Sequence, residues 1–171
     1  MMNIECTWEP IDESLSGSSP PQGMRPTTIR KYFSSMLSSN KETVRVGDFV
    51  ELVPGPGFNQ PRIAQVLALW KQLGRPKENC LFGRFLRYYR FAETSLNRIG
   101  LKSADNEKRV YKTTHIEDNV PLAAILNTCS VEVMSGVDAP TEFQTQQMSD
   151  KEALLCSATY DFETGALAPI E

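Results

Sequence analysis

The sequence predicts a mostly β domain, built as a small, distorted antiparallel β barrel with one short helix and long loops. Three observations lead to this fold class. Runs of alternating apolar and polar residues, rich in β-branched and aromatic side chains, recur along the chain. Clusters of Gly, Pro, Ser and Asn separate these runs. A length of 171 residues with a hydrophobic fraction of 40% suits one core with some unpacked chain attached.

The N-terminal residues 1–29 are predicted to form a flexible, acidic leader. Residues 9–26 are rich in Ser, Pro and Gly and poor in aromatic side chains, a composition that buries too little apolar surface to fold. The β domain is predicted over residues 30–165, and residues 166–171 are expected to form a C-terminal tail.

The predicted strands follow from period-two alternation and from the breakers at their ends. The run VRVGDFVELV contains Gly47-Asp48, which predicts a turn or bulge inside it. The later run CLFGRFLRYYRF is aromatic-rich, as is typical of a strand. The predicted strands cover residues 30–37, 44–53, 62–71, 80–91, 110–113, 128–134 and 153–160.

One helical turn is predicted over Pro121–Leu126, because proline suits the first position of a helix and Asp118 or Asn119 could cap it. Apolar residues of the predicted strands and of this turn are expected to supply the core. Those expected core residues are Ile63, Val66, Leu67, Leu69, Ile125, Leu126, Val131 and Val133.

The net charge of −3 hides a polarised chain. Residues 1–24 carry four acids and no Lys or Arg, residues 25–113 carry a net charge of +10, and residues 114–171 carry −9. Two interpretations stay open at this point. Either the basic middle segment meets an anionic partner, or the three segments fold together and neutralise one another.

Several classes of protein are excluded or disfavoured by composition. The sequence lacks a stretch of 18 apolar residues, so no membrane-spanning helix is predicted, and no secretory signal is expected at the N-terminus. Four scattered cysteines and one histidine exclude a zinc finger, and the cysteines are expected to be reduced thiols of an intracellular protein.

Enzyme chemistry is also disfavoured. The sequence has no Gly-x-Ser-x-Gly elbow, and Gly55-Pro56-Gly57 lacks the Lys-Ser/Thr pair of a phosphate-binding loop. Cys129 lies in an alternating apolar run, where a buried and inert thiol is expected. We therefore expect no catalytic activity, no cofactor and no metal site.

Residues Thr27–Phe33 allow one alternative function. Ile29 is followed three and four residues later by Tyr32 and Phe33, and this spacing resembles the motif by which replication proteins dock on the sliding clamp. Pro26 stands where that motif has its leading glutamine. The competing interpretation, which we favour, is a strand that packs Tyr32 or Phe33 into the barrel.

A series of short blocks carries a resemblance that spans most of the chain. The blocks are Val46-Gly47-Asp48-Phe49-Val50, Pro61-Arg62-Ile63-Ala64-Gln65-Val66, Tyr89-Arg90-Phe91-Ala92-Glu93-Thr94, Asn106-Glu107, Val110-Tyr111-Lys112-Thr113, Val120–Leu126 and Cys129-Ser130-Val131. In this order and spacing they resemble the bromo-adjacent homology (BAH) domain. The tail Ala153–Asp161, with Pro140-Thr141-Glu142 before it, looks like the end of the polybromo-type members of that family.

The resemblance implies a non-catalytic binding module of a larger nuclear protein that acts in chromatin and transcription regulation. The partners it implies are a histone tail or a nucleosome and other subunits of a chromatin complex, with contact to the DNA backbone also allowed. It implies no membrane partner, and the isolated domain is expected to be monomeric.

Some BAH domains read methyl-lysine with an aromatic cage, through cation–π attraction. By the resemblance, Arg62 and Arg87 replace two cage aromatics, whereas Tyr89 and the acid Glu93 persist. His115 and Glu117 match residues that grip the peptide backbone. The two arginines are expected to repel a cationic ligand and so to select against trimethyl-lysine.

Three further expectations concern this surface. If a cage is rebuilt, Trp70 and Tyr111 are the first candidates for its walls. Arg90 and Glu93 are expected to form a charge-assisted pair. A basic patch suited to nucleosomal DNA or to an acidic protein is expected in the loop around residues 98–109, from Arg98, Lys102, Lys108 and Arg109.

Overall fold

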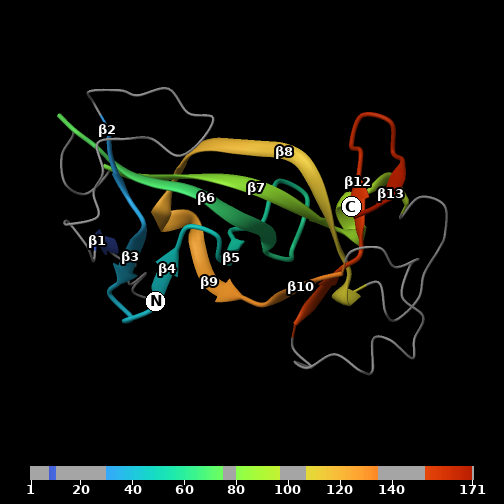
Figure 1. Ribbon diagram of the computed structural model, residues 1–171, viewed down its shortest axis with the longest axis horizontal. Helices are drawn as coiled ribbons and strands as arrows, with labels where there is room; N and C mark the ends of the chain where they lie inside the picture. The colour runs from blue at the N-terminus through green and yellow to red at the C-terminus, as the bar shows by residue number, and fades with distance from the viewer. Residues whose placement is uncertain (1–7, 11–29, 75–79, 97–106, 135–152, 171) are drawn as a thin grey trace.

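The fold is known from a computed structural model, which describes residues 8–10, 30–74, 80–96, 107–134 and 153–170. Thirteen strands and two one-turn 3₁₀ helices relevant to the site lie in these ranges (Figure 1). The strands are β1 (Trp8–Pro10), β2 (Arg30–Phe33), β3 (Ser35–Ser38), β4 (Thr43–Arg45), β5 (Phe49–Leu52), β6 (Arg62–Gln72), β7 (Leu81–Arg90), β8 (Val110–Pro121), β9 (Ile125–Cys129), β10 (Val131–Val133), β11 (Leu154–Cys156), β12 (Ala158–Tyr160) and β13 (Leu167–Pro169). The 3₁₀ helices are η2 (Phe91–Glu93) and η5 (Leu122–Ala124).

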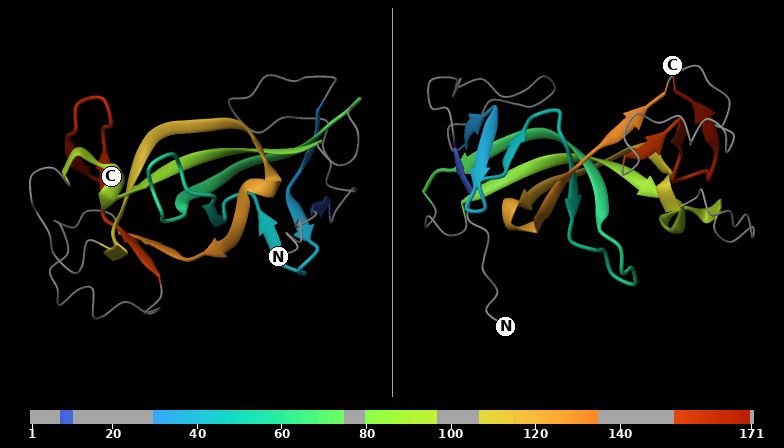
Figure 2. Two further views of the ribbon diagram at one scale, coloured as in Figure 1. Left: turned by 180° about the vertical axis from the view of Figure 1, so that it is seen from behind. Right: turned by 90° about the horizontal axis from the view of Figure 1, so that it is seen from below.

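The main sheet has the strand order β13-β12-β8-β7-β6-β5-β9, and β2 pairs with β6 beside this path. The long strands β6, β7 and β8 span the molecule, with β1–β4 at one end and β10–β13 at the other (Figures 1 and 2). Most pairings are antiparallel, and β8–β12 and β10–β11 are parallel. The mostly β class is confirmed, but the described part of the sheet twists without closing into a barrel, because β9 and β13 do not pair.

The core has three clusters of buried side chains. The largest includes Phe33, Val50, Val66 and Phe85 on one face of the sheet. A second, around Ile63 and Tyr88, packs on β11, and a third consists of Tyr32, Ala68 and Trp70 with Phe82 against it.

The prediction that Leu126 and Val133 belong to the core is wrong, because their side chains are exposed, with exposed fractions of 44% and 47%. Both belong to short strands near the border of the sheet, where one face meets solvent, so an alternating pattern marks a strand but not its buried face. Ile63, Val66, Leu69 and Ile125 are buried as expected.

The central strands match the sequence prediction within one residue at each end, and the predicted turn at Gly47-Asp48 lies between β4 and β5. Two predictions differ in extent. The short strand expected at 110–113 continues to Pro121, and the helical turn shrinks to η5, flanked by Pro121 and not by Asp118 or Asn119. The sequence did not predict the full length of β8, because one face of the strand is solvated and its polar residues resemble a loop.

The segments at the two ends depart from their predicted flexibility where they are described. Trp8–Pro10, inside the predicted leader, forms β1 and pairs with β3, and the Trp8 side chain is buried. Leu167–Pro169, inside the predicted tail, forms β13 against β12. The rest of the leader lies outside the described residues.

The sliding-clamp alternative is not supported by the fold. Tyr32 and Phe33 are each only 5% exposed, because β2 pairs with β6 and their side chains enter two different core clusters. A docking motif needs both rings free to enter a partner's pocket. In the described part of the chain, no helix has the length and apolar character needed to cross a membrane.

Candidate functional site

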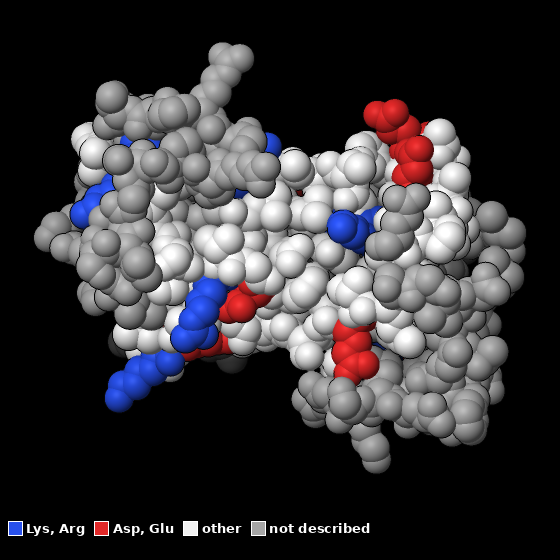
Figure 3. All heavy atoms as spheres, in the orientation of Figure 1, with Lys and Arg blue, Asp and Glu red and all other residues white. Residues whose placement is uncertain are grey.

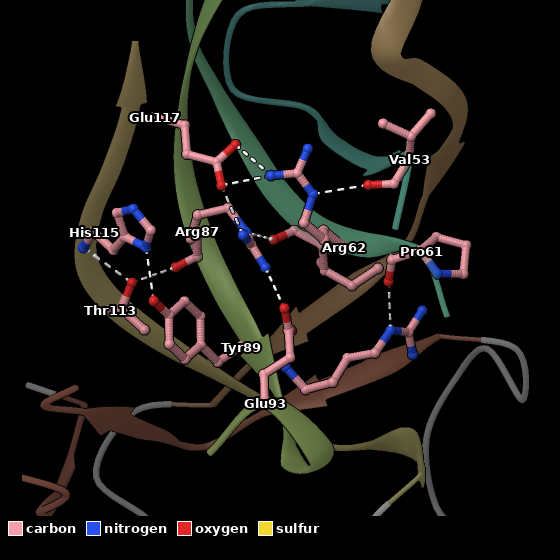
Figure 4. Close-up of polar contacts among 11 residues, drawn as sticks. Val53, Pro61, Arg62, Arg87, Tyr89, Glu93, Thr113, His115 and Glu117 are labelled. Carbon is pink, nitrogen blue, oxygen red and sulfur yellow. Dashed lines mark hydrogen bonds and ion pairs between the residues drawn. The ribbon is translucent and has the colours of Figure 1, made fainter. Parts of the chain in front are cut away.

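The six side chains predicted to bind a peptide form one connected cluster on β6, β7, η2 and β8 (Figure 4). The five residues on strands point to the same face because their strands are neighbours and they occupy alternate positions, and η2 brings Glu93 to the same face. The six are Arg62, Arg87, Tyr89, Glu93, His115 and Glu117.

Four of these side chains form an ion-pair network. Glu117 accepts hydrogen bonds from Arg62 Nη1 at 2.7 and 2.8 Å and from Arg87 Nη1 at 2.8 Å. Arg87 Nη2 donates to Glu93 at 2.6 Å, and the Arg87 side chain is only 5% exposed. The two arginines are therefore neutralised by two acids. The expectation that the two arginines select against trimethyl-lysine stays a prediction, with their charge now known to be paired with Glu93 and Glu117.

Main-chain contacts hold the network in place. Arg62 Nε donates to the Val53 carbonyl at 2.8 Å, and the Glu93 carboxylate also accepts the Arg90 main-chain N–H at 2.8 Å, at the start of η2. The predicted pair between the side chains of Arg90 and Glu93 does not form. The Arg90 guanidinium instead donates to the Pro61 carbonyl at 2.7 Å, and Arg87 takes its place on Glu93.

Tyr89 and His115 form the second half of the cluster. The Tyr89 hydroxyl lies 2.7 Å from His115 Nδ1, and the two rings pack edge to face at 5.8 Å. The Arg87 guanidinium lies 5.3 Å from the centre of the Tyr89 ring. Thr113 fixes the arrangement, because its hydroxyl donates to the Arg87 carbonyl and accepts the His115 main-chain N–H.

The sequence prediction missed Phe162 and Tyr160, which approach the same cluster from the β12–β13 hairpin. The Phe162 ring lies 5.6 Å from His115 and 6.4 Å from Tyr89, and its exposed fraction is 43%. The Tyr160 ring lies 6.0 Å from Tyr89. Burial is the main cause that raises the pKa of Tyr89, and the Arg87 charge opposes it. The signal in the sequence that could have identified Phe162 is an aromatic residue next to the turn of the β12–β13 hairpin, where side chains are usually exposed.

The two candidates for a rebuilt cage wall are corrected. Trp70 is 0% exposed and packs against Tyr32 and Phe82, far along β6 from Arg62. Tyr111 is 7% exposed, with its ring 6.5 Å from Tyr160. Both rings fill the interior, so neither offers a face to a ligand.

The predicted basic patch is only partly described. Arg98 and Lys102 lie outside the described residues. Lys108 is exposed, whereas Arg109 forms a β-bridge with Leu155 and its side chain hydrogen-bonds Tyr111. Part of the positive charge of this segment is thus used within the fold.

The cluster joins charge-paired groups to partly exposed rings. The Cys129 thiol on β9 is a poor nucleophile, because burial, helped by the Glu51 charge, raises its pKa to about 12.

A family model and a solved structure are similar to this chain. A family model described as the BAH domain matches residues 42–171. The crystal structure of the yeast Rsc2 BAH domain has a similar fold, with a TM-score of 0.56 and 17% sequence identity. The match covers 82% of this chain and 55% of that chain, so the present chain spans about half the length of the yeast structure. At this identity the likeness concerns the fold alone.

Proposed function

Because the chain belongs to the BAH domain family of chromatin-associated, generally non-catalytic modules, we propose that it binds a basic histone tail or another basic segment of a chromatin protein. The proposed contact surface is the ring cluster of Tyr89, His115 and Phe162. The proposal includes a nuclear location and a role within a larger chromatin regulator.

The exposed ring of Phe162 is the observation that carries the proposal. A large aromatic side chain that is 43% exposed lies between two exposed acids, Asp161 and Glu163. Hydrogen bonds from the main chain of residues 163 and 164 lower the pKa of Asp161, so its carboxylate stays ionised. Rings next to carboxylates favour lysine and arginine side chains, through cation–π and charge attraction.

The ion-pair network limits the choice of modification. Arginines stand at two positions where the family's methyl-lysine cage has rings, and they are held by Glu93 and Glu117. A trimethylammonium group placed there meets two guanidinium groups in place of two aromatic walls, and only Tyr89 remains as a ring. We therefore expect little preference for methylated over unmodified lysine at this position.

Methyl-lysine reading through a cage rebuilt elsewhere is the second candidate. The rings of Tyr89, His115 and Phe162 lie 5.6–6.4 Å from one another, which gives three aromatic groups around one point of the surface. The Arg87 guanidinium competes for the Tyr89 face in that arrangement.

The test is a calorimetric titration of histone-tail peptides and intact nucleosomes with the parent chain and with Phe162→Ala. Phe58→Ala is the matched control, because Phe58 is 44% exposed on the loop between β5 and β6. We expect Phe162→Ala to weaken binding about tenfold, roughly 1.4 kcal/mol, with no change for Phe58→Ala.

Two outcomes contradict the proposal: equal effects of both variants, or no binding of any tail peptide or nucleosome. Trimethylated and unmodified peptides titrated in parallel separate the two candidates. A preference above about tenfold that Phe162→Ala abolishes identifies a rebuilt cage.

A further inference from the structure

The short strand β1 lies at the outer edge of the three-stranded sheet β1-β3-β4, at the end of the molecule away from the ring cluster (Figures 1 and 2). It has three residues, and within the described ranges it pairs with β3 alone. In this antiparallel pair Trp8 lies opposite Ser38, and Glu9 lies opposite Leu37. The attachment of β1 to the rest of the fold therefore depends on few contacts.

A single hydrogen-bonded residue pair joins the described main chains of β1 and β3. The N–H and C=O of Ser38 are used on the other side, where they pair with main-chain groups of the β3–β4 turn at 2.8 and 2.9 Å. Bonded and non-bonded pairs alternate along an antiparallel ladder, so Glu9–Leu37 is the bonded pair. Ser35 faces the same side as Leu37, but β1 does not reach it. The edge of β3 is therefore longer than the strand that occupies it.

The Trp8 side chain provides the other attachment. It is 7% exposed and belongs to the largest core cluster, together with Phe33, Met36 and Val44 from the neighbouring strands. Its Nε1–H is buried without a hydrogen-bond partner. A buried indole N–H usually has an acceptor, and leaving it without one is destabilising. The pocket thus fits an aromatic ring but not the indole N–H.

Positive charge lies close to the edge of β3. Lys41 and Arg45 are exposed on the β3–β4 hairpin, and Arg45 is the cross-strand partner of Ser35. In Figure 3, Lys and Arg side chains predominate over Asp and Glu at the end of the molecule that carries β1–β4. The sequence of β1 itself places an acid, Glu9, next to the ring of Trp8. A ring followed by an acid therefore describes the chemistry that this edge accepts.

We propose that the outer edge of β3 is a docking site for an extended segment of another protein that carries a phenylalanine followed by an acidic residue. In this proposal β1 is the chain's own, displaceable occupant of the site. The partner strand pairs its main chain with Leu37 and Ser35 and places its ring in the pocket that Trp8 fills. Phenylalanine suits this pocket better than tryptophan, because its ring has no N–H to bury.

A segment of another protein fits this edge better than β1 of a second copy does. A second copy brings the same residues, and with them the same unpaired indole N–H. A longer partner strand that also reaches Ser35 gains a second bonded pair. When β1 leaves, the edge of β3 has unpaired main-chain groups, which is the state in which a sheet edge accepts a new strand. β1 thus blocks the site, and its displacement opens it.

The test is fluorescence anisotropy with a labelled synthetic peptide that has the sequence of residues 7–14 with Trp8→Phe, titrated with the full chain. The parent is compared with Trp8→Ala, which empties the pocket, and with the control Phe58→Ala, which removes an exposed ring elsewhere. In the parent, β1 competes with the peptide at the high effective concentration of a tethered segment. We therefore expect Trp8→Ala to bind the peptide at least about tenfold more tightly than the parent and Phe58→Ala do.

Two N-methylated forms of this peptide test the register. A methyl group on the main-chain nitrogen of residue 9 removes the donor that pairs with Leu37, whereas the nitrogen of residue 8 belongs to a non-bonded pair. We expect the first form to bind Trp8→Ala at least about tenfold more weakly than the unmethylated peptide, and the second to bind with little change.

The full-chain variant Glu9→Pro guards against misfolding of Trp8→Ala, because it removes the same donor from β1 and leaves the pocket residues intact. We expect it to bind the peptide more tightly than the parent does. Equal affinity of the parent and both opened variants overturns the proposal, as does equal binding of the two methylated peptides or no binding to either opened variant. A parent dimer in light scattering that Trp8→Ala converts to a monomer overturns the choice of another protein and assigns the edge to a second copy.

Discussion

Gly47 is the residue on which the path of the chain from β4 into β5 depends. Its φ of +99° lies in a region that side-chain-bearing residues rarely adopt, and its N–H donates to the Val66 carbonyl at 2.8 Å. A Cβ at this position meets nothing within 4 Å, so backbone conformation alone sets the cost of replacement.

We therefore expect Gly47→Ala to lower the free energy of unfolding by about 1–3 kcal/mol, measured by urea denaturation. Gly55→Ala is the control, because a Cβ there makes only an ordinary contact of 3.5 Å with Arg62, and its φ is not positive. Similar urea midpoints for the two variants would show that the turn relaxes without strain.

Cys129 makes stability depend on alkaline pH. Burial raises its pKa from 9.0 to about 12, and burial likewise raises the pKa of Tyr88 from 10.0 to about 12. The unfolded chain releases these protons first as pH rises. Stability is therefore full below pH 9 and is lost progressively toward pH 12.

We expect the urea midpoint of the parent, in reductant, to fall between about pH 8 and about pH 10.5. Cys129→Ala should show a smaller fall, since one of the buried groups with a raised pKa is then removed, while Tyr88 and the other buried groups still contribute with the same sign. A midpoint that is constant over this range, or identical pH profiles for parent and variant, contradicts the assignment.

The ion-pair network joins four elements, because Arg62 comes from β6, Arg87 from β7, Glu93 from η2 and Glu117 from β8. Removing Glu117 leaves the largely buried Arg87 paired only with Glu93 and leaves Arg62 without its acid. Breaking a buried pair in this way is strongly destabilising.

We expect Glu117→Gln to lower the free energy of unfolding by about 3 kcal/mol, measured by chemical denaturation. Glu163→Gln is the control, an exposed acid outside any described ion pair, which should change stability by less than about 0.5 kcal/mol. If Glu117→Gln and Glu163→Gln both changed the free energy of unfolding by the same small amount, solvent would be able to replace the Glu117 carboxylate without a loss of stability.

The strands differ in how far the sequence could predict them. β6 and β7 are long runs rich in apolar and aromatic residues and bounded by breakers, so their limits were predictable within a residue. β8 is partly solvated, and its polar residues from Thr114 to Asn119 resemble a loop. β1 and β13 are three-residue strands, too short for a local pattern to mark, and β1 is formed only by pairing with the distant β3.

The site was predictable in its members but not in its connections. The family resemblance marked six residues, and all six meet. That Arg87 and not Arg90 pairs with Glu93 depends on the turn of η2, which brings the acid back under β7. Phe162 joins only because the β12–β13 hairpin folds onto β8, a contact between segments about fifty residues apart in sequence.

For the whole molecule, the proposed peptide surface lies at the end of the β6–β8 strands that carries β12 and β13, and β2 lies at the other end (Figures 1 and 2). Sites without shared side chains are expected to act additively. We expect Arg30→Gln/Arg84→Gln to leave peptide affinity unchanged in a calorimetric titration. A loss of peptide affinity in this variant would mean that the two ends of the sheet are coupled.

The Arg62–Glu117–Arg87–Glu93 network also governs how this face can change in descendants of this sequence. Replacing Arg87 with a ring leaves Glu93 without a guanidinium partner and Glu117 with only one. Replacing Arg87 on the way to an aromatic cage thus passes through a chain with an uncompensated, mostly buried carboxylate, several kcal/mol less stable. Replacing Arg62 alone leaves Glu117 paired with Arg87. Stability by itself therefore favours keeping Arg87 at this face, whether or not a ligand binds there.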